Sequence, residues 1–173
     1  MESKRFILDE RNITSDMVLA DMEIRDLYRT AFLPAHRVPY DNMPQYIEGM
    51  PLDFLAYYLE GRLVGFLVVW RHAKVNWVWY IAIKEEFRRN GYGKAILSRY
   101  ISNHADRPTI LEREEELSEF YRKVGFSGTG TVDHYNNGGP DMGIMVSGDW
   151  NLIGGRDGYR EIREELAKRV QSI

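Results

Sequence analysis

The sequence predicts a single α/β (α+β) domain with a central mixed, mostly antiparallel sheet and helices on both faces. Residues 77–83 (WVWYIAI) carry no charge and are apolar on both alternating faces, which is typical of a strand covered on both sides. A glycine-containing loop, a run with helical spacing and a second short apolar run follow, which predicts a strand–helix–strand unit with parallel strands. With 173 residues and 44% hydrophobic content, the chain is large enough for one substantial core.

The amino-terminal third predicts a short strand followed by helical segments. Residues 6–8 are expected to form the strand, and residues 14–16 (TSD) supply candidate helix N-caps. Apolar residues recur at helical spacing over residues 24–32, which predicts a helix. Residues 34–42 (PAHRVPYDN) are rich in helix breakers and predict a loop, and a brief helix is expected over residues 43–48.

The central region predicts an antiparallel meander of three strands. Residues 52–59 and 63–70 are strand-like, and the glycine between them indicates a hairpin turn at residues 60–62. Residues 71–76 supply the second turn, which leads into the apolar strand at 77–83. In that strand, strict alternation places Trp77, Trp79, Ile81 and Ile83 on one face and Val78, Tyr80 and Ala82 on the other.

The region after the glycine loop predicts a helix, a short strand, a second helix and a final pair of strands. Pro108 ends the first helical connection, and residues 109–112 form the short strand. A helix over residues 117–124 is expected to stop at the glycine that follows it. Residues 127–133 and 142–147 predict an antiparallel pair joined by the sequence NNGGPD.

The carboxy-terminal segment is expected to be separate from the domain. Residues 151–158 contain two adjacent glycines and predict a linker. An amphipathic helix follows, which is expected to pack on the domain or on a second subunit of a homodimer. Its apolar face consists of Tyr159, Ile162, Leu166 and Val170. The expected organisation is a domain over residues 1–148 and a linker with its helix over residues 149–173.

The composition narrows the possible functions. A net charge of -3 gives no basic surface for nucleic acid. The absence of cysteine excludes a disulfide framework, a thiolate metal site and a cysteine nucleophile, and the four histidines lack metal-ligand spacing, so no metal is expected. The start (MESKRFILDERN) lacks the apolar core of a signal peptide, and no apolar run reaches membrane-spanning length. These features predict a cytoplasmic protein without a membrane partner.

A basic, glycine-containing loop lies between the apolar strand and the next helix. It consists of Arg88, Arg89, Asn90, Gly91, Tyr92, Gly93 and Lys94. Because glycine has no Cβ, backbone N–H groups can turn toward a bound anion, and the positive end of the helix points at the same place. The pattern indicates a phosphate-binding loop, or alternatively a tight strand-to-helix turn with a solvated basic rim.

Two well-known phosphate-binding patterns fit this loop less well. The P-loop pattern GxxxxGK[ST] requires a glycine spacing and a terminal serine or threonine hydroxyl, and this chain has neither. The dinucleotide fingerprint GxGxxG requires a third small residue where this chain has Ile96. Glu112, about twenty residues further on, lies where that fingerprint expects a ribose-binding carboxylate, so dinucleotide-dependent redox chemistry remains an alternative.

A third pattern fits better. The motif R-x-x-G-x-G, here Arg88, Gly91 and Gly93, follows an apolar strand that ends in Ala82 and Ile83, and it resembles the coenzyme A loop of the GNAT superfamily of N-acetyltransferases. A second segment, LSEFYRKVGF at residues 117–126, resembles the other signature of that family, FY-x-x-x-GF. The resemblance implies a GNAT-like fold with acetyl-CoA as cosubstrate. It also implies transfer of the acetyl group to a primary amine of a small molecule or peptide by direct attack.

The resemblance further implies roles for particular residues. In this family the strand at 77–83 splays away from its parallel neighbour, and the pantetheine arm pairs with main chain around Ala82 and Ile83. The backbone N–H of Ile83 is the expected donor to the carbonyl oxygen, and Tyr121 is the expected acid for the departing thiolate. The loop from Arg88 to Lys94 is expected to bind the phosphates. Glu114 lies where many relatives have an asparagine on the coenzyme side.

The chain departs from the family at the general base. A lysine-like amine has a pKa near 10.4, so its deprotonation at pH 7 costs roughly 4–5 kcal/mol, and a carboxylate usually accepts the proton. Relatives often carry a glutamate four residues before the position of Ile83, where this chain has Trp79. Glu112 is the first substitute. The missing glutamate also motivates an alternative function, an acyl-CoA-binding regulatory module without turnover.

The acceptor is the least defined part of the expected site. In GNAT-like folds the region around residues 34–48 helps to form the acceptor side, although an ordinary surface loop explains the same sequence. The candidate contacts there are Arg37, Tyr40, Asp41 and Tyr46. The acidic charge balance mildly favours a cationic amine.

Overall fold

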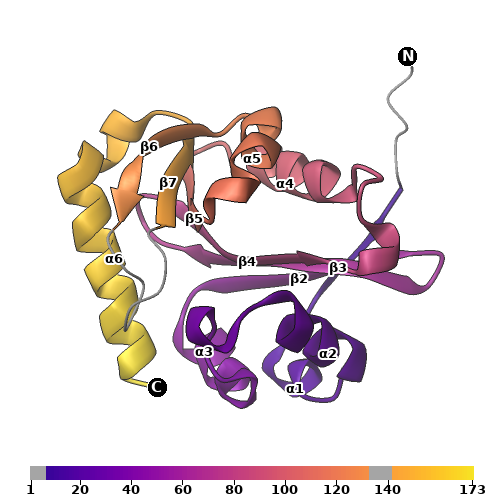
Figure 1. Ribbon diagram of the computed structural model, residues 1–173. Helices are drawn as coiled ribbons and strands as arrows, with labels where there is room; N and C mark the ends of the chain where they lie inside the picture. The colour runs from indigo at the N-terminus through magenta and orange to yellow at the C-terminus, as the bar shows by residue number, and fades with distance from the viewer. Residues whose placement is uncertain (1–6, 133–141) are drawn as a thin grey trace.

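A seven-stranded mixed sheet organises residues 7–132 and 142–173, which are the residues that the computed structural model describes (Figure 1). Its strands are β1 (Asp9–Asn12), β2 (Leu52–Leu59), β3 (Arg62–Arg71), β4 (Asn76–Ile83), β5 (Thr109–Arg113), β6 (Ser127–Val132) and β7 (Met142–Ser147). They lie in the order β1-β2-β3-β4-β5-β7-β6, and only β4 and β5 pair in parallel. The predicted mixed, mostly antiparallel sheet is confirmed.

Helices cover both faces of this sheet, as expected from the apolar residues on both sides of β4. The helices are α1 (Ser15–Val18), α2 (Met22–Ala31), α3 (Met43–Gly49), α4 (Tyr92–Asn103), α5 (Ser118–Val124) and α6 (Gly155–Gln171). Figure 1 shows α1 to α3 on one face and α4 and α5 on the other, with α6 upright at one end of the sheet. Each face has its own core cluster, and the apolar side of α6 joins the cluster of α1 to α3. Within residues 7–132 and 142–173, no helix has the length and apolar character needed to cross a membrane.

The amino-terminal elements differ in detail from the sequence expectation. The first strand is β1, not residues 6–8, and Phe6 lies outside the described residues. Leu8 is buried beneath α4 and α5 instead of pairing in the sheet, which explains its apolar character. The predicted helix at 24–32 is confirmed as α2, and its N-cap is Asp21, whose side chain accepts a hydrogen bond from Ile24 N. Residues 34–42 form two short 3₁₀ turns.

The predicted meander of β2, β3 and β4 is confirmed. The turn between β2 and β3 has Glu60 at φ 50° and Gly61 at φ 79°. Two successive positive φ angles are typical of the two-residue hairpin turns whose twist matches that of the strands. Local turn chemistry and the alternation of apolar residues therefore specify this half of the sheet.

The predicted alternation along β4 is wrong beyond Val78. The pairing with β3 passes from Val69↔Val78 to Val68↔Tyr80, so Trp79 is an additional residue and forms a β-bulge. Because of this extra residue, the side chains after it point to the face opposite to the one that strict alternation predicts. Tyr80 and Ala82 therefore join Trp77 in the core beneath α2. On the opposite face, Val78, Ile81 and Ile83 contact the cluster of α4 and α5.

The strand–helix–strand unit is confirmed, and its two strands separate quickly. The parallel ladder consists of Asn76↔Thr109 and Trp77↔Ile110. The structure describes all of β4, and none of its residues after Trp77 pairs with β5. This is the expected splay of the central parallel pair. After β5, the predicted helix and its glycine stop are confirmed by α5 and by Gly125 at φ 104°. The final pair of strands is confirmed as β6 and β7, and the NNGGPD connection lies outside the described residues.

The predicted linker over residues 151–158 is wrong. Residues Trp150–Ile153 form a 3₁₀ turn, and α6 begins at Gly155. Gly154 and Gly155 adopt φ 87° and 61°, so they make a sharp turn into the helix where the sequence suggested a flexible connection. The amphipathic helix itself is confirmed, and it packs on its own chain through Tyr159, Ile162 and Leu166. The homodimer remains a prediction.

Candidate active site

A cavity of about 440 Å³ opens where β4 and β5 part. Its walls come from β4, β5, α5 and the segment after α2. Lys84 N donates to Val64 O of β3 (2.8 Å), and successive N–H groups of a strand point in opposite directions. The N–H of Ile83 therefore faces away from β3, on the side where β4 has lost its partner.

The glycine loop lies beyond the end of β4 and leads into α4. Arg89 and Gly91 adopt left-handed backbone angles (φ 61° and 85°), and no side chain caps the helix at Gly91. The first intrahelical bond runs from Ala95 N to Gly91 O (3.0 Å), so the amides of Gly93 and Lys94 precede the helical hydrogen-bond ladder. Uncapped amides at a helix N-terminus form an anion-binding site.

Side chains of the loop also hold its shape. Arg88 Nε donates to Ile83 O (2.9 Å), which ties the loop to the end of β4. Asn90 Nδ2 donates to the carbonyls of Phe87 (3.3 Å) and Arg88 (2.9 Å). A Cβ on Gly93 would lie 3.2 Å from Phe120 Cζ, so glycine permits the close approach of α4 and α5. Arg88 and Asn90 therefore shape the loop, while the side chains of Arg89 and Lys94 are exposed.

Tyr121 lines the cavity from α5 and is 6% exposed. Its ring packs edge-on against Phe120 and Phe126, with centroids 5.0 and 5.8 Å away. Burial raises the pKa of the Tyr121 hydroxyl to about 12. The side chain therefore belongs to the core and also reaches the cavity, and it holds its proton more firmly than an exposed tyrosine.

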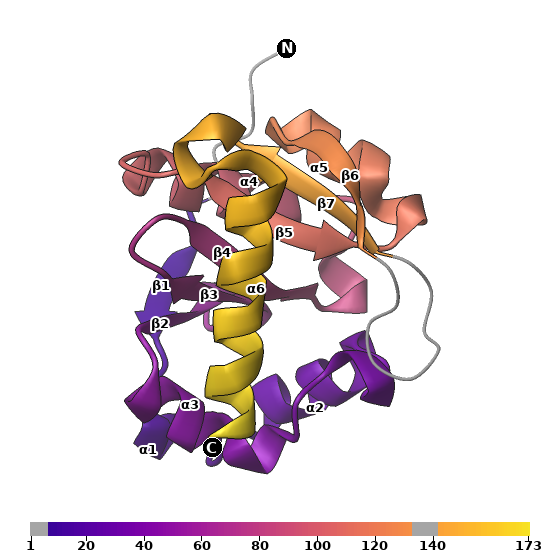
Figure 2. The same ribbon diagram turned by 90° about the vertical axis from the view of Figure 1, so that its left-hand side faces the viewer.

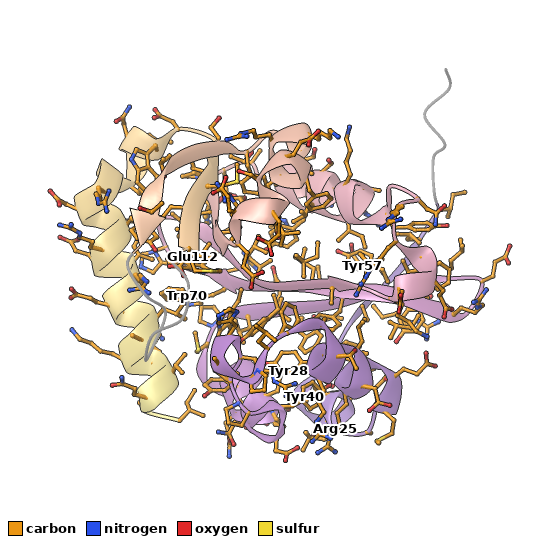
Figure 3. The ribbon with its side chains drawn as sticks, viewed as in Figure 1. Arg25, Tyr28, Tyr40, Tyr57, Trp70 and Glu112 are labelled. Carbon is orange, nitrogen blue, oxygen red and sulfur yellow. The ribbon has the colours of Figure 1, made fainter. Side chains whose placement is uncertain are left out.

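Glu112 lies between the cavity and α6 (Figure 3). Its side chain is 6% exposed, and Oε1 accepts hydrogen bonds from Arg163 Nε (2.9 Å) and from the hydroxyl of Tyr159. Burial raises the pKa of the Glu112 carboxyl, although the Tyr159 hydrogen bond and the Arg163 charge lower it in part. Helix α6 thus supplies two partners for a carboxylate of the candidate site.

His36 and Glu114 meet across the mouth of the cavity. His36 Nδ1 lies 3.3 Å from Glu114 Oε1, and the histidine side chain is 12% exposed. Sequence patterns indicated no functional role for any histidine, yet His36 borders both the cavity and a neighbouring hollow. Among the described residues, no group of three or more His, Cys, Asp or Glu side chains could hold a metal ion.

The neighbouring hollow has a volume of about 330 Å³ and lies between α6, the bulged part of β4 and residues 35–38. Of the four candidate acceptor contacts, Arg37 lines this hollow. The hydroxyls of Tyr40 and Tyr46 instead donate to Val18 O (2.7 Å) and Val170 O (3.4 Å). Asp41 forms an ion pair with Arg25.

Sequence patterns contain no signal for several residues of this site. Tyr159 and Arg163 are separated from Glu112 by 47 and 51 residues. His36 likewise meets Glu114 only through the fold. In the sequence, Tyr159 was expected only as part of the apolar face of a tail helix.

Comparisons with known proteins agree on the fold. Residues 51–128 match the family model described as an acetyltransferase (GNAT) domain. No curated protein matches the sequence. Among solved structures, a Bacteroides thetaiotaomicron protein assigned to the GNAT acetyltransferases is 23% identical with a TM-score of 0.71, covering 91% of this chain and 95% of that chain.

Two further structures are similar over most of their length. The ribosomal-protein-S18-alanine N-acetyltransferase from Escherichia coli is 18% identical with a TM-score of 0.65, covering 82% of this chain and 93% of that chain. An aminoglycoside 6'-N-acetyltransferase complexed with coenzyme A is 15% identical with a TM-score of 0.64, covering 80% of this chain and 96% of that chain. At these identities the likeness shows a common fold.

Proposed function

We propose that the protein is an acetyl-CoA-dependent N-acetyltransferase, because residues 51–128 match the family model described as an acetyltransferase (GNAT) domain. In this proposal a primary amine attacks the acetyl group directly while both substrates are bound. The observation that carries it is the parting of β4 and β5 after two residue pairs, which leaves a cavity between them, while the glycine loop and the uncapped N-terminus of α4 follow the end of β4. Such a gap suits an extended arm, and the helix end suits the pyrophosphate attached to it.

The residues of the glycine loop fit the coenzyme phosphates. The amides of Gly93 and Lys94 and the positive end of α4 are expected to hold the pyrophosphate, with charge added by Arg89 and Lys94. The pantetheine arm is expected to run along the main chain of Ala82 and Ile83 on the free side of β4, where Ile83 presents its N–H, since the alternation that turns Lys84 N toward β3 does the same for Ala82 N. Glu114 borders the same cavity and is expected to contact this arm.

Two groups are proposed to stabilise charge during the transfer. When bound, acetyl-CoA supplies an activated acetyl group. The N–H of Ile83 is proposed to donate to the acetyl oxygen as negative charge develops there. The hydroxyl of Tyr121 is proposed to donate to the departing sulfur. Because its pKa is raised to about 12, full proton transfer to a thiolate of pKa near 8.5 is uphill, and a charge-assisted hydrogen bond supplies part of the stabilisation.

The amine proton must leave before or during the attack, and Glu112 is the proposed acceptor. Its raised pKa makes it a stronger base than an ordinary carboxylate, and it borders the cavity on the side of Trp79. His36 is a second candidate, since it lines the cavity and the adjacent hollow and is held by Glu114. Histidine is the most frequent general base in enzymes.

A binding module without turnover is the second candidate function. The observation that favours it is Trp79, an indole that cannot accept a proton, in the place where relatives often have a glutamate. The same cavity and loop could then bind an acyl-CoA as a signal.

Release of free thiol from acetyl-CoA in the presence of a panel of primary amines tests these alternatives. We expect steady turnover with at least one amine class, with the acetylated amine identified by mass spectrometry. Coenzyme binding without turnover across a broad panel would favour the module. The absence of both binding and turnover would contradict both proposals.

A further inference from the structure

We infer that the acceptor amine also carries an anionic group, either a carboxylate or a phosphate, and that this group binds at Arg37 in the hollow beside the cavity. The inference rests on the proposed acetyl transfer and specifies its substrate class. Three observations support it: the Arg37 guanidinium has a buried nitrogen without a hydrogen-bond partner among the described residues, the hollow contains positive charge, and the hollow joins the cavity.

The guanidinium of Arg37 is incompletely satisfied. Its Nη1 atom is buried and has no hydrogen-bond partner among the described residues. The group lies over the ring of Tyr28, with Cζ 5.8 Å from the ring centroid, and this contact holds it at the wall of the hollow. A buried charged donor without an acceptor is costly, so the site favours a ligand that brings acceptor oxygens.

The charges around the hollow favour an anion. Helix α6 contributes Arg160, Arg163 and Glu164, which lie on one face of the helix at the spacing of one turn. Together with Arg37, these residues give three positive charges and one negative charge. Arg163 is paired with Glu112, whereas Arg160 is mostly exposed at the rim, where it lies 3.8 Å from Asp157. Glu164 and Asp157 offset the charge of Arg160 at the edge, so the positive charge inside the hollow that no carboxylate of the described residues pairs with is that of Arg37.

This local charge differs from the charge of the whole chain. The formal net charge of -3 suggested a cationic acceptor. Interactions between charges more than about 8–10 Å apart are largely screened at ordinary ionic strength, so the residues of the hollow determine what binds there.

The hollow also leads to the place where the acetyl group would react. Three residues, His36, Trp79 and Tyr80, line both the hollow and the cavity between β4 and β5. The bulge at Trp79 places this side chain at the junction of the two spaces. Figure 2 shows α6 in front of the end of the sheet, and residues of α6 line one wall of the hollow. An amine held by its anionic group on Arg37 can thus direct its nitrogen past His36 and Trp79.

Matched acceptor pairs test the inference. One pair compares a free amino acid with its carboxamide, and a second compares an amine that carries a phosphate monoester with the corresponding amino alcohol. We expect kcat/KM to be at least about tenfold higher for the anionic member of one or both pairs. The pair that shows the preference identifies the anion as carboxylate or phosphate.

Arg37→Met keeps the length of the side chain and removes its charge. We expect this variant to lose the preference, with an approximately tenfold or greater fall in kcat/KM for the anionic acceptor and little change for the neutral one. Arg29→Met, on the exposed side of α2, is the matched control and should behave as the wild type. If Arg37→Met does not fold, Arg160→Met removes an exposed charge from the rim, and a higher KM for the anionic acceptor alone is expected.

A binding measurement supplies a readout that does not depend on turnover. Calorimetric titration with succinate and with succinamide, in the presence of coenzyme A, should show tighter binding of the dianion in the wild type and no difference in Arg37→Met. Equal transfer to neutral and anionic acceptors would overturn this inference and leave the acetyltransferase proposal intact. The absence of transfer to every amine would instead contradict the proposed function.

Discussion

At the scale of single residues, Tyr121 has both a packing role and a proposed chemical role. Its ring fills the core between Phe120 and Phe126, whereas its hydroxyl is the proposed donor to the departing sulfur. Tyr121→Phe keeps the ring and removes the hydroxyl. We therefore predict a fall in kcat of about 100-fold with little change in the Kd of coenzyme A. Steady-state kinetics and a coenzyme titration on the same preparation measure both quantities, and a kcat within about twofold of the wild type would contradict the assigned role.

Glu112 gives a prediction about pH. A base must be deprotonated to act, and burial raises the pKa of this carboxyl, so kcat/KM should rise with pH through a limb displaced above the usual range of a glutamate. Glu112→Gln should lower the rate by about 100-fold and abolish this limb. The charged and titratable groups around it are Tyr159, Arg163 and His36.

The matched variant for this measurement is His36→Gln, which removes the other candidate base from the same cavity. If Glu112 is the base, the limb persists in His36→Gln and disappears in Glu112→Gln. The reverse result would assign the proton transfer to His36 and Glu114, and would show that the assignment of Glu112 is wrong. Thermal melts of both variants check that each still folds.

At the scale of elements, the junction between the turn at Trp150–Ile153 and α6 depends on Gly158. A Cβ at this position would lie 1.5 Å from Ile153 O, so alanine forces the helix away from the turn. We predict that Gly158→Ala lowers the free energy of unfolding by about 1–3 kcal/mol. It should also lower acetyl transfer, because α6 carries the two partners of Glu112.

Chemical denaturation of Gly158→Ala measures this effect, with Glu161→Ala, an exposed change on the same helix, as the control. Unchanged stability and activity of Gly158→Ala would indicate that α6 docks independently of this close contact. Equal losses in both variants would show that the loss does not depend on the close contact between Gly158 and the turn.

The sequence predicts the local elements better than their contacts. The hairpin at Gly61, the stop at Gly125 and the loop at Gly91 depend on a few neighbouring residues, and all three are confirmed. The bulge at Trp79 is not predictable from alternation, because it is visible only as a change of register against β3. The sharp turn at Gly154 was predicted as part of a linker, because the sequence does not distinguish a glycine in a flexible segment from a glycine in a tight turn.

The candidate site shows the same division. The loop, Ile83 and Tyr121 could be named from short motifs. In the structure Tyr121 lines the cavity, Ile83 ends β4 beyond its pairing with β5, and the loop follows. The contacts of Glu112 with α6 and of Glu114 with His36 join segments that are distant in the chain. No periodicity or spacing relates these segments, so this half of the site emerges only from the fold.

At the scale of the whole molecule, the sheet separates the proposed coenzyme-binding region from the proposed acceptor-binding region. The face covered by α4 and α5 carries the glycine loop and Tyr121, and the face covered by α1 to α3 together with α6 borders the arginine-lined hollow. The parting of β4 and β5 connects the two sides. This arrangement lets two substrates approach one point from opposite directions, which supports a transfer with both substrates bound.

Calorimetric titration of the protein with coenzyme A and with pantetheine, which lacks the pyrophosphate, tests this account most directly. We predict saturable one-to-one binding of coenzyme A and binding of pantetheine that is at least about tenfold weaker, because the amides at the start of α4 are proposed to bind the phosphates that pantetheine lacks. NADH should not compete with coenzyme A. No detectable heat with millimolar coenzyme A, or equal affinity for pantetheine, would contradict the account.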